Sequence, residues 1–126
     1  MIQANDDVKF GRGFMELKID FACPLFEEDI ACAITPEDLN DFYSGVNELD
    51  TLNLFFMLEA SFHKYLSEDK HDLASHFAFL IAYYVFIPLT PPASYHLALH
   101  YINEAVRLSP HNKNYANWLE MIKNGN

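Results

Sequence analysis

The sequence predicts an all-α fold, an antiparallel array of four to five helices. Three observations predict it. Apolar residues recur with helical spacing in the segments after residue 35. Capping residues and prolines separate these segments. Of the 126 residues, 51% are hydrophobic, enough to form the core of one domain. We therefore expect a single helical domain over residues 1–126, with an N-terminal segment (1–34), an acidic helical hairpin (35–66) and a second hairpin with a capping helix (72–123).

One short N-terminal strand is the only non-helical element that the pattern favours. Apolar and polar residues alternate over residues 17–23, with Lys18 and Asp20 as the polar members. A period of two indicates a strand. A helix in this segment is the alternative.

The first helix is predicted to begin after Thr35, an N-cap residue, with Pro36 at the first helical position. Glu37 and Asp38 then place negative charge at the positive end of the helix dipole. Gly45 marks its end or a bend. Its apolar face consists of Leu39, Phe42, Tyr43 and Val46.

The second helix is expected to run from an Asp50 cap to about Leu66. Its apolar side chains form one broad face. These residues are Leu52, Phe55, Phe56, Phe62, Tyr65 and Leu66.

The third helix, from Asp72 to about Ile87, is apolar nearly all round, with Ser75 and His76 as its clearly polar positions. Such a helix belongs at the centre of a fold. The prolines that follow Ile87 end it. A fourth helix is expected over residues 93–108 and a fifth, capping helix over residues 112–123.

The fourth helix resembles the second helix of a tetratricopeptide repeat, with small residues at Ala98 and Ala105 and a closing Pro110. The third helix resembles the first helix of that repeat. Its matching positions are Phe77, Leu80, Ile81 and Tyr84, of which Ile81 replaces the family's glycine. The resemblance covers residues 72–123. It implies a TPR-like hairpin with a groove that binds a peptide or protein and performs no chemistry.

Some members of that family hold a terminal carboxylate with Lys and Asn. Ala78 and Ala82 occupy the corresponding positions here, so an acidic peptide tail is a poor candidate ligand. The resemblance places a candidate apolar groove around four aromatic residues. They are Tyr83, Phe86, Tyr115 and Trp118.

Negative charge is concentrated in the first half of the chain. The formal net charge is -10, and no Lys or Arg occurs from Ile19 to Phe62. This excess disfavours nucleic acid and anionic membranes and favours a basic protein surface as partner. Solubility alone is the alternative explanation. The candidate acidic contact residues are Glu27, Glu28, Asp29, Glu37, Asp38, Asp41 and Glu48.

Two functional hypotheses follow. The first is a small acidic inhibitor that neutralises a basic partner such as a toxin nuclease, as bacterial immunity proteins and antitoxins do. The second is a TPR-like chaperone or assembly adaptor that uses the aromatic groove. No phosphate loop, nucleophile elbow or zinc-protease motif occurs, so we expect neither an enzyme nor a cofactor.

Neither the histidines nor the cysteines are expected to form a site. His96 and His100 share a helix face at i, i+4 but lack further ligands nearby in sequence, so we expect solvated surface residues and no metal. Cys23 and Cys32 are expected to be buried thiols.

The N-terminus lacks the features of a secretory signal, and the apolar run from residue 77 to 88 is shorter than a membrane span, so we expect a cytoplasmic protein.

Overall fold

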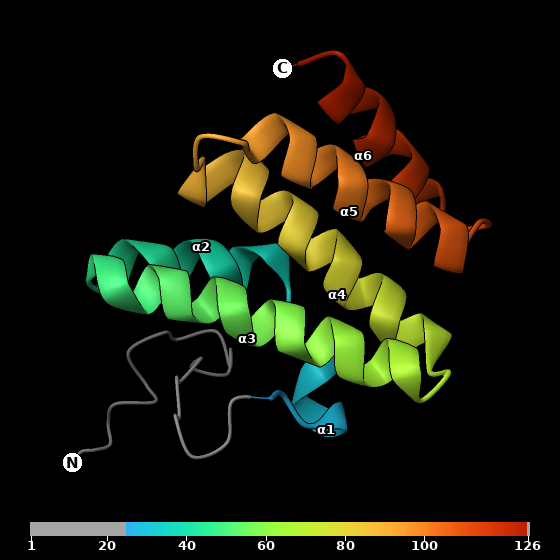
Figure 1. Cartoon of the computed structure of the whole chain (residues 1–126), viewed down its shortest axis with the longest axis horizontal. Coiled ribbons are helices and arrows are strands. Elements are labelled where there is room, and N and C mark those ends of the chain that lie inside the picture. The colour runs from blue at the N-terminus through green and yellow to red at the C-terminus, as the bar shows by residue number, and fades with distance from the viewer. Residues whose placement is uncertain (1–24, 126) are drawn as a thin grey trace.

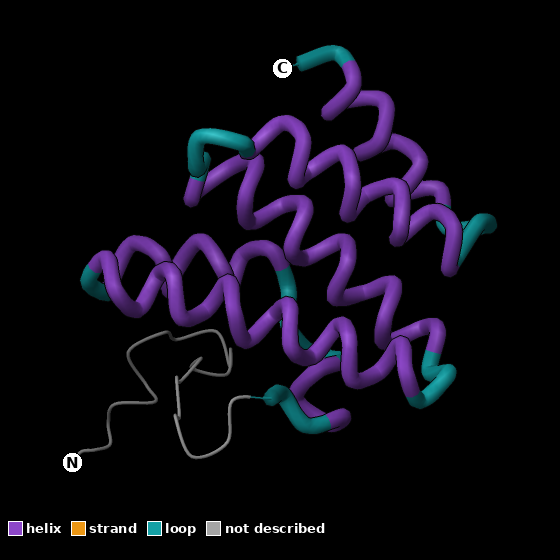
Figure 2. Tube along the Cα trace, in the orientation of Figure 1, coloured by secondary structure: helices purple, strands orange, loops and turns teal. Residues whose placement is uncertain are grey.

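A computed structural model describes residues 25–125, which contain helices and no strand. Figures 1 and 2 show consecutive helices running back and forth beside one another, as expected for an antiparallel array. The strand predicted over residues 17–23 lies outside the described residues. The elements are α1 (Glu28–Ala31), α2 (Pro36–Gly45), α3 (Glu48–Ser67), α4 (His71–Tyr84), the π-helical turn η2 (Val85–Leu89), α5 (Ser94–Leu108) and α6 (Lys113–Lys123).

Local capping chemistry sets the start of α2 as predicted. The Thr35 hydroxyl accepts a hydrogen bond from the Asp38 amide, and the Asp38 carboxylate accepts one from the Thr35 amide. This reciprocal capping box satisfies two backbone donors at once. The helix ends at Gly45, also as predicted.

The start of α3 differs from the prediction. The helix begins at Glu48, and Asn47 is its cap, with the Asn47 side chain accepting a 2.8 Å hydrogen bond from the Asp50 amide. Asp50 was therefore the wrong cap residue. Asn and Asp are both good N-cap residues, and the helix begins after the earlier of the two.

The apolar third helix is confirmed, and it continues into a wider turn. Pro88 has no amide hydrogen to donate to the carbonyl four residues before it. The backbone widens over η2, and the Thr90 amide donates to the Val85 carbonyl five residues back. Thr90 then adopts a left-handed conformation with φ of 42°.

Helix α4 lies at the centre of the array, between α3 and α5, while α6 packs against α5 (Figure 1). Ala98 and Ala105 on α5 are fully buried, as their small size suggested. One hydrophobic cluster draws buried side chains from all six α-helices. Examples are Ala31, Leu39, Leu58, Leu80, Ile102 and Ile122.

The continuous helical stretch His71–Leu89 is long and apolar enough to cross a membrane by length and composition alone. Of its most apolar window, 61% is buried inside the protein. The buried core helix of a globular protein meets the same two criteria.

Candidate functional site

Most of the predicted acidic residues are on the surface, and one is not. Glu27, Glu28 and Asp29 are exposed around α1, and Glu37, Asp41 and Glu48 are exposed on α2 and at the start of α3. Asp38 is only 7% exposed, because its carboxylate is held against the Thr35 amide. Asp38 therefore belongs to the helix cap and offers little surface to a partner.

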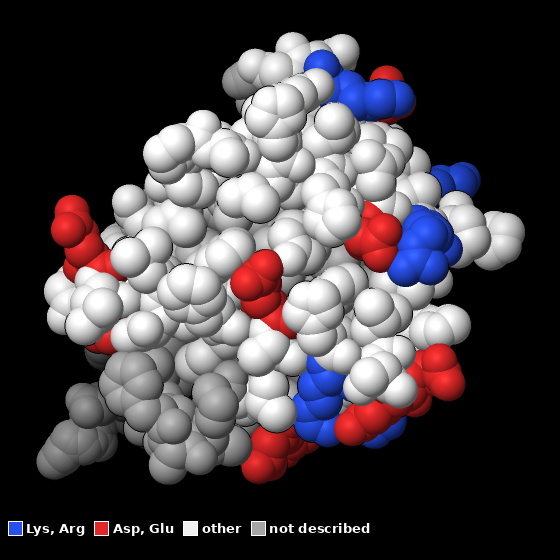
Figure 3. All heavy atoms as spheres, viewed as in Figure 1, with Lys and Arg blue, Asp and Glu red and all other residues white. Residues whose placement is uncertain are grey.

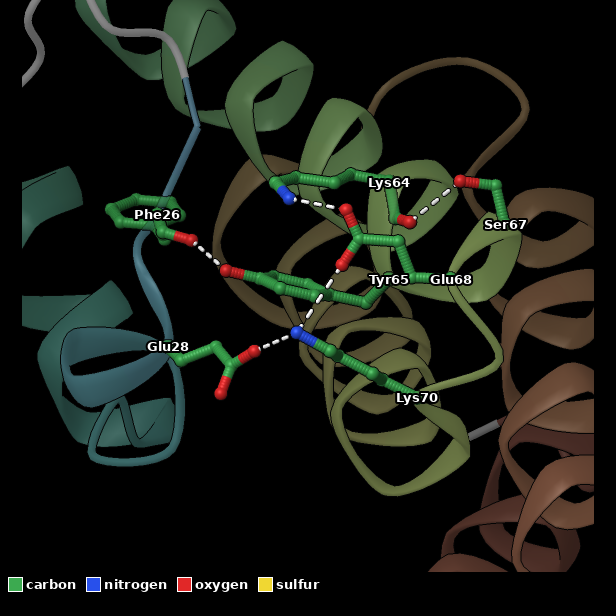
Figure 4. A network of polar contacts seen from close by, with 7 residues as sticks. All are labelled: Phe26, Glu28, Lys64, Tyr65, Ser67, Glu68 and Lys70. Carbon is green, nitrogen blue, oxygen red and sulfur yellow. Dashed lines mark hydrogen bonds and ion pairs between the residues drawn. The ribbon is translucent and has the colours of Figure 1, made fainter.

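Glu28 is the acidic candidate most closely tied to a cation. Its carboxylate forms an ion pair with the Lys70 ammonium, which also lies 3.3 Å from a Glu68 oxygen (Figure 4). Hydrogen bonding to Glu28 and then to Glu68 raises the pKa of Lys70. Lys64, 2.6 Å from Glu68, is the largest cause of the lowered pKa of the Glu68 carboxyl group. These exposed pairs contribute little to stability, but they lower the negative charge beside α1.

The same region joins the start of the described chain to α3. The Phe26 amide donates a 3.0 Å hydrogen bond to the Ser61 hydroxyl. The Tyr65 hydroxyl donates a 2.5 Å bond to the Phe26 carbonyl (Figure 4). The Phe26 ring stacks on Phe77 of α4, with centroids 6.0 Å apart. The acidic α1 segment is thus held in a defined place.

The distribution of charged residues over one face of the molecule is visible in the space-filling view. Figure 3 shows the α3 side of the molecule with acidic atoms both near its edges and near its centre, separated by stretches of uncharged surface. In sequence, the described acidic candidates begin at Glu27 and end at Glu48. On this side the carboxylates are therefore scattered and do not form one continuous acidic patch.

The predicted aromatic groove is mostly core. Tyr83 and Tyr115 are 8% and 7% exposed, whereas Phe86 and Trp118 are half-buried. Trp118 makes an edge contact with Tyr83, with ring centroids 5.5 Å apart. Trp118 and Phe86 are therefore the two members that can meet a partner.

Packing brings the acidic helix α2 next to this aromatic cluster. The Asn40 side-chain amide of α2 donates a hydrogen bond to the Tyr83 hydroxyl of α4. Glu37 precedes Asn40 by three residues, and so lies on the same side of α2. A residue of the acidic helix α2 therefore contacts a buried member of the aromatic cluster.

The structure also turns part of the predicted apolar face of α3 outward. Phe62 and Tyr65 are buried, as expected, but Leu52 and Phe56 are 46% and 59% exposed. The prediction from the sequence pattern was wrong for these two residues because α3 has apolar residues on opposite sides. Leu54 and Leu58 lie on the buried side. Only packing identifies which side faces the core.

The remaining candidate residues, the histidines and cysteines, do not form a metal or catalytic site within residues 25–125. His96 and His100 are exposed on α5, as expected, and no group of three potential metal ligands occurs in this part of the chain. Cys32 is exposed, so its expected burial was wrong, and Cys23 lies outside the described residues. The Tyr101 hydroxyl donates a 2.5 Å hydrogen bond to Glu59, a link between α5 and α3 that the sequence did not suggest.

Comparison of the chain with models of known families, with curated proteins and with solved structures finds no match. Function is therefore inferred from the surfaces of the chain itself.

Proposed function

We propose that this chain is a non-enzymatic protein-binding module that binds and neutralises a basic protein in the cytoplasm, as small acidic immunity and antitoxin proteins do with cationic toxins. The observation that carries the proposal is the group of exposed carboxylates on α1, α2 and the start of α3. No Lys or Arg lies in the sequence between them.

A basic partner matches this surface electrostatically. Glu37 and Glu48 are exposed, and neither is in an ion pair with another described residue. Their charge is available to attract a cationic surface, which speeds encounter and makes affinity fall as salt rises. The rigid helices present these charges without a large ordering cost on binding.

Charge reversal on α2 and α3 tests the proposal. The variant Glu37→Lys, Asp41→Lys, Glu48→Lys leaves Asp38 intact, because that carboxylate caps α2. Wild-type protein immobilised at low salt should retain a basic protein from extracts of its source cell, identified by mass spectrometry. The variant should lose it, and adding wild-type chain to the purified partner should suppress the partner's activity.

A matched control separates specific contact from overall charge. Asp69, Asp72 and Glu120 are also exposed, and their reversal to Lys changes the net charge by the same amount. This control should keep the partner. If both variants retain the partner equally, and circular dichroism confirms that both are folded, the acidic surface is not the binding site.

A TPR-like chaperone or adaptor is the second candidate, favoured by the half-buried Trp118 and Phe86 on the α4–η2 and α6 side. An apolar contact there would survive high salt, because screening acts on charges. Shortening both residues to Ala would then abolish partner retention, whereas the charge reversal would have little effect.

A further inference from the structure

Within the described residues, helix α3 has an apolar stripe on its exposed side. Leu49, Leu52 and Phe56 are 65%, 46% and 59% exposed, and their i, i+3, i+7 spacing places them on one face. The half-buried Phe55 contacts the Phe56 ring at a centroid distance of 5.5 Å and widens the stripe. Isolated exposed hydrophobic residues are common, but three on successive turns form a contiguous patch of the kind that marks an interaction site.

Carboxylates stand at both ends of this stripe. Glu48 is four residues before Leu52, and Glu59 is three residues after Phe56, so helical spacing places each beside the apolar side chains. The Tyr101 hydroxyl holds the Glu59 carboxylate in place through a 2.5 Å hydrogen bond. No Lys or Arg occurs from residue 25 to residue 63.

We propose that the stripe of Leu49, Leu52 and Phe56 is a docking site for a cationic amphipathic helix of the partner. The helix's apolar ridge would pack on the three side chains, and its Lys or Arg residues would meet Glu48 and Glu59. Charge complementarity selects this occupant, because an apolar stripe flanked by carboxylates repels an acidic helix and leaves a neutral one without ionic contacts. The inference rests on the proposed binding of a basic protein and names the surface that receives it.

The test uses the full chain and two labelled helical peptides of about 18 residues. The peptides share the same stripe of Leu residues, and they carry either Lys or Glu on both sides of it. Fluorescence anisotropy should show binding of the Lys peptide and not of the Glu peptide. The double variant Leu52→Ser, Phe56→Ser should weaken binding about tenfold, because it removes most of the buried apolar contact. Glu48→Gln should weaken it about threefold at low salt and not at high salt.

Ile30→Ser is the matched control, since Ile30 is exposed and apolar but belongs to α1. It should leave peptide affinity unchanged. Equal binding of the Lys and Glu peptides, or equal loss with the control, would overturn the proposal.

Two other occupants give distinct results that would also overturn it. If a second copy covers the stripe, the wild-type chain sediments as a dimer and the double variant as a monomer. If residues 1–24 cover it, the chain binds neither peptide and the double variant melts at a lower temperature. If the double variant retains the native basic partner and the charge-reversal variant loses it, the proposed function holds but the stripe is not the docking site.

Discussion

At the scale of single residues, burial decides what a charged or titratable side chain does. Asp38 and Glu37 are neighbours in the first turn of α2, yet one carboxylate is buried in the cap and the other is exposed. His76 is partly buried and bonded to the backbone, whereas His96 is exposed. Residue type alone therefore does not separate structural groups from those available to a partner.

Asp38→Ala should lower the free energy of unfolding by about 1 kcal/mol, because it removes half of the capping box and leaves the Thr35 amide without its acceptor. Urea denaturation followed by circular dichroism measures the change. Glu37→Ala removes the exposed neighbour and should cost at most about 0.5 kcal/mol. Equal losses would show that the Asp38 carboxylate does not cap the helix.

His76 should make stability depend on pH. Its Nε2 lies 2.8 Å from the Ile34 carbonyl, and burial lowers its pKa below the ordinary value of 6.5. The unfolded chain then binds a proton more readily than the folded chain, so the free energy of unfolding falls as pH falls below about 6.5. His76→Gln should flatten this dependence between about pH 7.5 and pH 5.

The exposed His111 supplies the comparison, since His111→Gln should leave the slope as in the wild type. Urea titrations at a series of pH values give the slope directly. An unchanged slope in the His76 variant would mean that another group causes the acid sensitivity.

At the scale of elements, prolines and caps determine where helices begin and end. Pro36 starts α2, and Pro88 widens the end of the apolar helix into η2. The connection after η2 passes through Thr90 at φ of 42°, a conformation that a β-branched residue adopts at a cost. This local strain is a testable property of the connection between η2 and α5.

Thr90→Gly should raise the free energy of unfolding by about 0.5 kcal/mol, since relief of left-handed strain exceeds the added entropy of the unfolded chain. The Thr90 amide keeps its bond to the Val85 carbonyl. Asp69→Gly is the comparison, because Asp69 has φ of 60° but aspartate tolerates this conformation. Its effect should be smaller, and a larger gain at Asp69 would contradict the strain argument.

At the scale of the whole molecule, the array depends on α4. It packs on both α3 and α5, and the fully buried Tyr84 donates a 2.8 Å hydrogen bond to the Thr51 carbonyl of α3. Burial also raises the pKa of the Tyr84 hydroxyl, so it remains a neutral donor at physiological pH. Within α4 itself the sole Asp, Glu, Lys or Arg is Asp72, in its first turn.

Leu80→Ala should destabilise the protein by about 2–5 kcal/mol, because Leu80 is fully buried at the centre of the array. Near- and far-ultraviolet circular dichroism should report a single unfolding transition. Leu49→Ala removes the same atoms from an exposed position of α3 and should change stability little. Two separate transitions would show that the two halves unfold independently.

The sequence by itself determined the all-α class, the start of α2, the central apolar helix and the concentration of acidic residues. These properties depend on caps, prolines and composition, which act within a helical turn or require no packing at all. Only the tertiary structure decided which face of α3 is buried, because apolar residues occur on both sides of that helix. It also decided that Tyr83 is core and that α2 lies beside it, through a hydrogen bond from Asn40, 43 residues away in the chain. Contacts of that range depend on the packing of whole helices, which short-range patterns do not encode.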